Sequence, residues 1–171
     1  MTPVTIQGAA LRTALRPYAS GIAVLTAADS AGPAGVTITS LTSISTEPAL
    51  VSFALADTSS TWRRIKDSQW FGIQILAGDQ LDLAQRFATP GTDRFAPPTR
   101  WHTGPHGVPL VEGCLSWLVC SRYDQIRLGD HHLVVGAVDY AEVGAGGDSL
   151  VHLHGALQPV ASVALTQASV D

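Results

Sequence analysis

The residues from Thr37 to Thr46 are unusually rich in hydroxyl groups, since seven of the ten are Ser or Thr. A hydroxyl both donates and accepts hydrogen bonds from a short side chain. A row of hydroxyls beside exposed backbone N–H groups can therefore bind a neutral polar heterocycle or a phosphate. The alternative is a Thr-rich edge strand that reflects β-propensity alone.

A second hydroxyl cluster, Ser59, Ser60 and Thr61, follows an apolar run and opens a predicted helix. The first turn of a helix presents unpaired N–H groups and the positive end of the helix dipole, which suits a phosphate. A plain N-cap explains the cluster nearly as well. Neither G-x-G-x-x-G nor G-x-x-x-x-G-K-[ST] occurs, so the common dinucleotide and P-loop folds are not supported.

Arginine and histidine supply the other candidate groups. Arg94 begins a Pro- and Gly-rich loop, where it can meet an anion or a neighbouring carboxylate. His131 and His132 are adjacent in a predicted strand and therefore point to opposite faces, whereas His152 and His154 are expected to share a face. No carboxylate or Cys completes a metal set, and no nucleophile motif occurs. This pattern favours a bound cofactor that carries the chemistry.

The elements that must position these groups are mostly strands joined by short turns. Regular strand–helix alternation is missing, which argues against a doubly wound fold. We predict a mainly β barrel with peripheral helices, and a bulge or bend at Ser40–Leu41, where the apolar alternation slips. The expected strands are 21–28, 35–45, 49–56, 70–77, 113–127, 131–143 and 149–160; the expected helices are 9–18, 60–67 and one capped by Asp79; and 89–109 is a long loop.

A chain of 171 residues is expected to form one domain, with its core at about residues 9–160. Charged residues make up only 14% of it, against about 25% in ordinary domains. The net charge is −4 and the cations are scattered, so we expect no nucleic-acid partner. The apolar stretches are far shorter than the ~20 residues of a membrane-spanning helix, so no membrane association is expected.

Residues 1–10 lack the basic and apolar pattern of a secretion signal. Cys114 and Cys120 lie six residues apart on one predicted strand, roughly 20 Å along the chain. Because a disulfide needs Cα atoms within about 7 Å, an internal bridge is not expected. A cytoplasmic location is the simple expectation.

The segment Gly35–Ser45, followed by Glu47–Val51, resembles the G-x-T-x-N-S-F-T-S-V-S…P-P-L-V signature of short-chain flavin reductases. These are the reductase components of two-component flavin-dependent monooxygenases. The resemblance covers roughly residues 9 to 160. Further pieces follow in the family's order: Ser59–Thr61, Phe71–Ala77, Phe87–Ala88 with Asp93–Phe95, Gly129–His131, and Gly155.

The resemblance implies an FMN-binding split β-barrel that forms a homodimer, with flavin near the subunit interface. It implies NAD(P)H-dependent reduction of FMN or FAD by hydride transfer, with NADH or NADPH as co-substrate. Reduced flavin would then pass to a separate flavin-dependent oxygenase or halogenase.

The resemblance also assigns roles by position. Thr37, Thr39, Ser40, Leu41 and Thr42 would line the flavin ring and ribityl chain; Ser59, Ser60 and Thr61 would hold the phosphate; Ala88 and Arg94 would close around the flavin tail; His152 takes the place of a common aromatic residue beside the cofactor; and His131 would be the catalytic group at the nicotinamide.

Several positions depart from the family pattern; among them Thr39 replaces Asn, Leu41 replaces Phe, His152 replaces an aromatic side chain and His154 replaces Arg. Two alternatives therefore stay open. One is a flavin-binding barrel without reductase activity, acting as a carrier or partner subunit. The other is a barrel that uses its bound flavin on its own substrate, with His152 or His154 as an acid.

Overall fold

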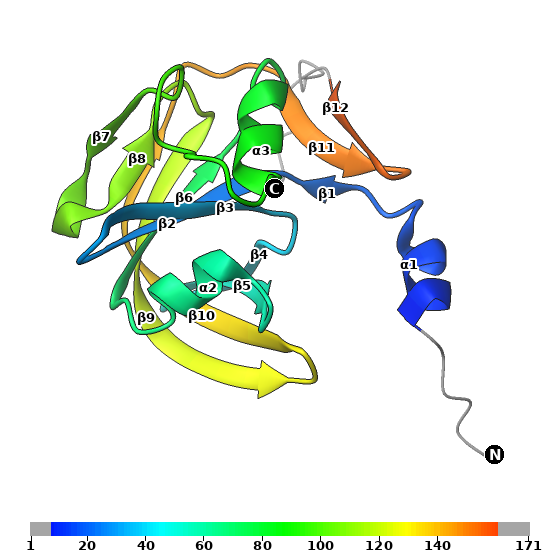
Figure 1. Ribbon diagram of the computed structural model, residues 1–171, viewed down its shortest axis with the longest axis horizontal. Coiled ribbons are helices and arrows are strands. Elements are labelled where there is room, and N and C mark those ends of the chain that lie inside the picture. The colour runs from blue at the N-terminus through cyan, green and yellow to red at the C-terminus, as the bar shows by residue number, and fades with distance from the viewer. Residues whose placement is uncertain (1–7, 161–171) are drawn as a thin grey trace, which may run out of the picture.

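A curved antiparallel sheet of seven strands forms the body of the protein in the computed structural model, which describes residues 8–160 (Figure 1). The expectation about a leader in residues 1–10 therefore falls mostly outside the described residues. In sheet order the strands are β3 (Gly32–Ile38), β2 (Ala23–Asp29), β6 (Trp70–Ile75), β9 (Ser116–Leu128), β10 (His131–Val143), β5 (Ala49–Ala56) and β4 (Thr42–Thr46).

Two smaller sheets and short helices surround this body, so the predicted mainly β fold with peripheral helices is confirmed. None of the helices within residues 8–160 is long and apolar enough to cross a membrane. The small sheets are β1 (Ser20–Gly21) with β11 (Ser149–Leu153) and β12 (Ala156–Val160), and β7 (Trp101–Thr103) with β8 (Pro109–Val111); the helices are α1 (Gly8–Leu15), α2 (Ser60–Ile65), α3 (Leu81–Ala88) and the 3-10 turn η1 (Pro105–Gly107).

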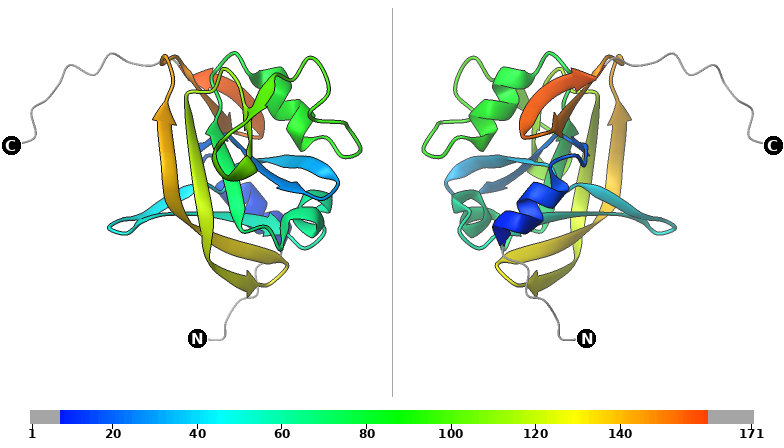
Figure 2. Two further views of the ribbon diagram at one scale, coloured as in Figure 1. Left: turned by 90° about the vertical axis from the view of Figure 1, so that its left-hand side faces the viewer. Right: turned by 90° about the vertical axis from the view of Figure 1, so that its right-hand side faces the viewer.

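The two outer strands of the large sheet, β3 and β4, follow each other in the chain but are not paired in the described residues. The predicted break at Ser40–Leu41 is confirmed, because β3 ends at Ile38 and β4 begins at Thr42. Ser40 Oγ donates to the carbonyl of Ala54 at 3.1 Å and accepts from its N–H at 2.9 Å. The sheet thus curls until its edges approach without a ladder between them, and the β4–β5 hairpin projects from the body (Figure 2).

The core lies on both faces of β2, whose residues from Ala23 to Ala27 are all buried. Leu25 packs with Phe53 and Phe71 inside the curve of the sheet. Val24, on the opposite face, packs in a second cluster beneath α3. This two-sided burial explains why the strand shows no apolar–polar alternation; its one buried polar residue, Thr26, donates its hydroxyl to the carbonyl of Pro109.

Several predicted boundaries are wrong. The first helix ends at Leu15 rather than at residue 18, and Tyr18 is exposed. The third helix is not capped by Asp79. Gln80 occupies the N-cap position, and its side chain instead accepts from the N–H of Ala77.

The predicted last strand is a hairpin, β11–β12, which turns at His154 and Gly155. Both turn residues have positive φ, so His154 does not share a strand face with His152 as expected. Cys114 precedes β9 instead of lying within it. Both cysteines are free and buried, and burial raises the pKa of each thiol to about 12.

Candidate functional site

The C-terminal end of β5 is the point where the predicted site segments converge. On one side the bend at Ser40 is bonded to Ala54. On the other side His131, the first residue of β10, is paired with Ala56. The chain then leaves β5 and enters α2 through Ser59, so three separate segments are brought to one end of the sheet.

A cleft of about 440 Å³, here called the anion cleft, lies between the first half of β3, α2 and the loop 91–95. Ser60 and Thr61, which were predicted to hold the phosphate, line it together with Arg94, which was predicted to close around the flavin tail. Arg64 also lines it, although sequence reasoning missed this residue. Its spacing of four from Ser60, which places both on one helix face, was the available signal.

Arg94 brings an uncompensated positive charge to this cleft. Its Nη1 donates to the carbonyl of Gly35 and to Thr61 Oγ1, both at 2.7 Å. Its Nε is buried and has no hydrogen-bond partner among residues 8–160, and burial lowers the pKa of the Arg94 guanidinium. Within residues 8–160 no carboxylate pairs with it; Asp93 instead accepts from the backbone N–H of Phe95. The cleft is therefore suited to an anion.

The other hydroxyls predicted around this cleft serve the fold. Ser59 is the N-cap of α2, and its Oγ accepts from the N–H of Trp62 at 3.2 Å. Thr37 Oγ1 donates to the carbonyl of Ala84 in α3 at 2.6 Å. Ala88, the last residue of α3, is exposed and does not line the cleft. The N-cap interpretation thus holds for Ser59, while Ser60 stays available to a ligand.

A second cleft of about 650 Å³, here called the α1 cleft, separates α1 from the bend after β3. Thr39 and Ser40 line it together with His152, although His152 lies far from both in the sequence. His152 is carried there by the pairing of β11 with β1, in which it lies opposite Ser20. Thr42, by contrast, is exposed on β4.

Leu41 lies outside both clefts and packs against the core cluster inside the curve of the sheet. It is partly buried, in contact with the cluster that contains Phe53. The residues of the bend therefore have different surroundings. Thr39 and Ser40 line the α1 cleft, whereas Leu41 anchors the bend to the core.

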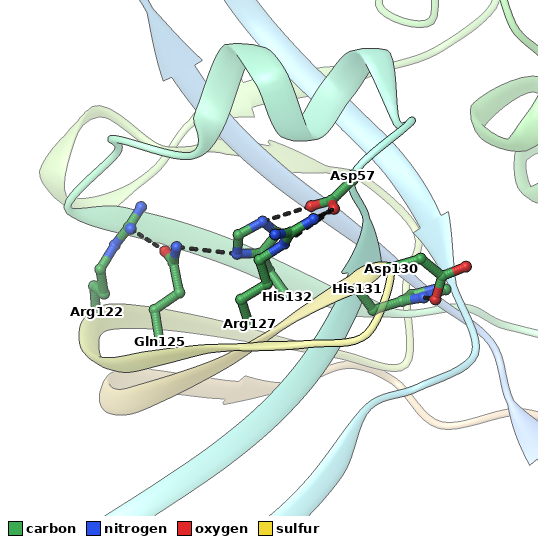
Figure 3. A network of polar contacts seen from close by, with 7 residues as sticks. All are labelled: Asp57, Arg122, Gln125, Arg127, Asp130, His131 and His132. Carbon is green, nitrogen blue, oxygen red and sulfur yellow. Dashed lines mark hydrogen bonds and ion pairs between the residues drawn. The ribbon is translucent and has the colours of Figure 1, made fainter.

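His131 and His132 point to opposite faces of β10, as expected (Figure 3). His131 is exposed, lines neither cleft, and has its Nδ1 2.7 Å from Asp130 Oδ1. His132 faces α2, where its ring lies 4.8 Å from the ring of Trp62. In the described part of the chain no group of three or more His, Cys, Asp or Glu residues is placed to hold a metal ion.

Comparison with known proteins agrees with this architecture. The model of the flavin reductase like domain matches residues 15–161. An NADH:FMN oxidoreductase from Rhodococcus qingshengii is 41% identical over 127 residues, which are 74% of this chain and 66% of that protein. Across the first five curated relatives, the aligned region spans 42% to 66% of the relative.

Solved structures of similar proteins have the same fold. BorF, the flavin reductase component of a bacterial two-component tryptophan halogenase, superposes with a TM-score of 0.84 at 28% identity, over 92% of this chain and 100% of its own. The NADH:FAD oxidoreductase SgcE6 of Streptomyces globisporus C-1027 also gives 0.84, at 26% identity, over 95% of this chain and 99% of its own. With most of its length matched by the family model, the chain belongs to the flavin reductase like domain family.

Proposed function

We propose that the chain is a single-domain NAD(P)H:flavin oxidoreductase that binds FMN or FAD along β3 and supplies reduced flavin to a separate oxygenase or halogenase. One observation carries the proposal: β3 and the bend after it connect the two clefts. Gly35 lines the anion cleft and Thr39 lines the α1 cleft. Four residues of extended chain span about 13 Å. A ligand with an anionic end and a polar ring suits this arrangement.

The residues of the anion cleft fit a flavin phosphate. Arg94 offers a guanidinium without a carboxylate partner in the described chain, and Ser60 offers a hydroxyl that the fold does not use. Thr39 and Ser40 at the other end of β3 offer polar groups to the edge of a heterocycle. A bound flavin supplies the two-electron redox chemistry, and the protein supplies binding and orientation.

Orientation is the main task of this chain's residues in the proposed reaction. Hydride transfer between two rings requires contact distance and stacking rather than a general base. His131 is proposed as the nicotinamide contact. The nearby carboxylate of Asp130 orients its imidazole, and the exposed ring is accessible from solvent. One similar protein is an NADH:FMN oxidoreductase and another is an NADH:FAD oxidoreductase, so both flavins belong in the test.

We further propose a cytoplasmic homodimer. Large apolar side chains are exposed on the projecting hairpins, among them Ile44 on β4 and Tyr123 and Ile126 on β9. Only 14% of the residues are charged, so little charge opposes association of two copies. Light scattering coupled to gel filtration should give twice the chain mass of 17.9 kDa. A monomer at micromolar concentration contradicts this part of the proposal.

The test of the function is an anaerobic titration of the purified protein with FMN and with FAD, followed by NADH and then NADPH. Saturable flavin binding, followed by loss of the visible absorbance of oxidised flavin in at least one combination, supports the proposal. No reduction in any combination by folded protein overturns it.

A flavin carrier without reductase activity is the second candidate. The observation that favours it is the position of His131, which lines neither cleft. The same titration separates the two functions. Tight flavin binding without consumption of NADH or NADPH selects the carrier, whereas catalytic turnover with excess flavin selects the reductase.

A further inference from the structure

A chain of polar side chains runs beneath α2 (Figure 3), and none of its members lines either cleft. Arg122 Nη1 donates to Gln125 Oε1. Gln125 Nε2 lies 3.3 Å from His132 Nδ1, and His132 Nε2 lies 2.6 Å from Asp57 Oδ1. Arg127 contacts the other carboxylate oxygen, with Nη2 2.8 Å from Asp57 Oδ2. Each of the three inner groups therefore has a partner on both sides.

Arg122, at one end, determines the direction of the hydrogen bonds that run from Gln125 through His132 to Asp57. A guanidinium only donates, so Gln125 turns its carbonyl to Arg122 and its amide to His132. The amide donates in turn, which makes His132 Nδ1 an acceptor and places the imidazole hydrogen on Nε2. That hydrogen then points at Asp57. A neutral His132 with its hydrogen on Nε2 satisfies all of these contacts.

The network is attached to both ends of α2. Asp57 lies two residues before the N-cap Ser59, and its backbone N–H donates to the carbonyl of Asp130 at 2.9 Å. Its pKa is held below the ordinary value, chiefly by the hydrogen bond from Arg127. At the other end, Arg122 Nη2 donates to the carbonyl of Ser68 at 2.7 Å, just beyond the helix.

The two faces of α2 meet different surroundings. Trp62 and Ile65 are buried toward the barrel, and the ring of Trp62 lies against that of His132. Ser60 and Arg64 face the anion cleft. A shift of the helix on the network therefore moves the groups that line the cleft.

We propose that the pair formed by Asp57 and His132, ordered by Gln125 and Arg122, is the positioning device that sets α2 against the anion cleft. His132 touches no ligand and acts only through α2. The identity of the anion as a flavin phosphate rests on the proposed function, whereas the positioning of the cleft itself does not. The affinity of the cleft for an anion should then depend on His132, which lies on the other side of α2.

Two substitutions at one position test this. In His132→Gln the amide nitrogen can replace Nε2 as donor to Asp57. In His132→Leu the packing against Trp62 is kept and the donor is lost. We expect the Leu variant to raise the Kd for FMN about tenfold, the effect of one hydrogen bond to a charged group, and the Gln variant to restore most of the affinity. At saturating flavin kcat should stay unchanged in both.

His102→Leu is the matched control, because His102 is exposed on β7 and lines neither cleft. Gln125→Leu breaks the same network from its other side and replaces His132→Leu if that variant does not fold. A folded variant of either kind with unchanged Kd overturns the inference, and so does equal loss in His132→Gln and His132→Leu.

Two further readouts separate this inference from the proposed function. Titration with inorganic phosphate measures the anion affinity of the cleft without flavin. A wild-type protein that binds phosphate but not FMN would overturn the proposed function and leave this inference standing.

Nitrogen-15 NMR of the imidazole should show the hydrogen of His132 on Nε2 in the wild type. A wild-type hydrogen on Nδ1 overturns the inference.

Discussion

Arg64 lies across the carboxylate of Asp29, with Nε 2.8 Å from Oδ2 and Nη2 2.8 Å from Oδ1. The same Nη2 donates to the carbonyl of Gly32 at 3.1 Å, at the start of β3. One ion pair thus joins the wall of the anion cleft formed by α2 to the β2–β3 turn. Arg64 is consequently fixed in place, while Arg94 on the opposite wall retains an unpartnered Nε.

Asp29→Asn should destabilise the fold at neutral pH and have no effect in strong acid. The hydrogen bond from Arg64 lowers the pKa of Asp29 to about 2, from 3.8. The ion pair therefore stabilises the folded state above about pH 4, and this contribution is lost as the pH falls from 3.8 towards 2. Urea unfolding of both proteins between pH 7 and pH 2 measures the difference.

The control for that experiment is Asp67→Asn. Asp67 is largely exposed, and its Oδ2 lies 4.0 Å from Nζ of Lys66. It should leave the free energy of unfolding nearly unchanged throughout. A difference between wild type and Asp29→Asn that persists undiminished at pH 2 would refute the ion-pair explanation.

Arg94→Gln should weaken flavin binding by roughly tenfold to a hundredfold, since a hydrogen bond to a charged group contributes about 1.5–3 kcal/mol. Flavin fluorescence quenching measures the Kd. Arg86→Gln is the control, because Arg86 lies on α3 and lines neither cleft. If Arg86→Gln weakens binding as much as Arg94→Gln, the phosphate lies elsewhere.

His131→Ala should raise the KM for the nicotinamide about two- to tenfold, the effect of one lost hydrogen bond, and the KM for flavin less. The physical reason is that the imidazole is exposed and oriented by Asp130 rather than directed into either cleft. Steady-state kinetics with each substrate varied in turn measures both constants, with His102→Ala as control. The opposite order of effects would remove His131 from the nicotinamide site.

Gly72→Ala should cost about 1–3 kcal/mol of stability, as overpacking of a filled core does. A Cβ at Gly72 would lie 2.5 Å from Thr26 Oγ1, and 2.7 Å from both Gln74 Nε2 and Val108 Cγ1. Thermal or urea unfolding measures the loss. Gly21→Ala, whose Cβ would meet nothing within 4 Å, is the comparison and should be close to wild type.

The elements that the sequence predicted best are those whose signals are local. The strand at 49–56 has the predicted bounds, because an apolar run is delimited by Pro48 and Asp57. The bend at Ser40 was visible as a slip in alternation. Ser60, Thr61 and Arg94 line one cleft, and only the family resemblance had assigned all three to a flavin, since nothing local relates residue 94 to residue 60. Their roles at a ligand stay predictions.

The parts that were missed depend on pairs distant in sequence. Arg64 meets Asp29 across 35 residues, and His132 on β10 meets Asp57 at the end of the neighbouring strand β5. Neither pair has a spacing that a local pattern could reveal. The prediction that Asp79 caps α3 was wrong for a different reason. Gln80 is the N-cap residue instead, and its side chain accepts from the N–H of Ala77.

The unpaired edges of β3 and β4 have a mechanical consequence. Neighbouring strands of the large sheet are joined by ladders of backbone hydrogen bonds, whereas within residues 8–160 no ladder joins β3 to β4, and the bend between them is held to β5 by the hydroxyl of Ser40 on Ala54. At this seam no ladder of backbone hydrogen bonds between the described strands resists a load applied across the sheet. The barrel has a built-in line of weakness, and that line runs beside the bend that carries Thr39.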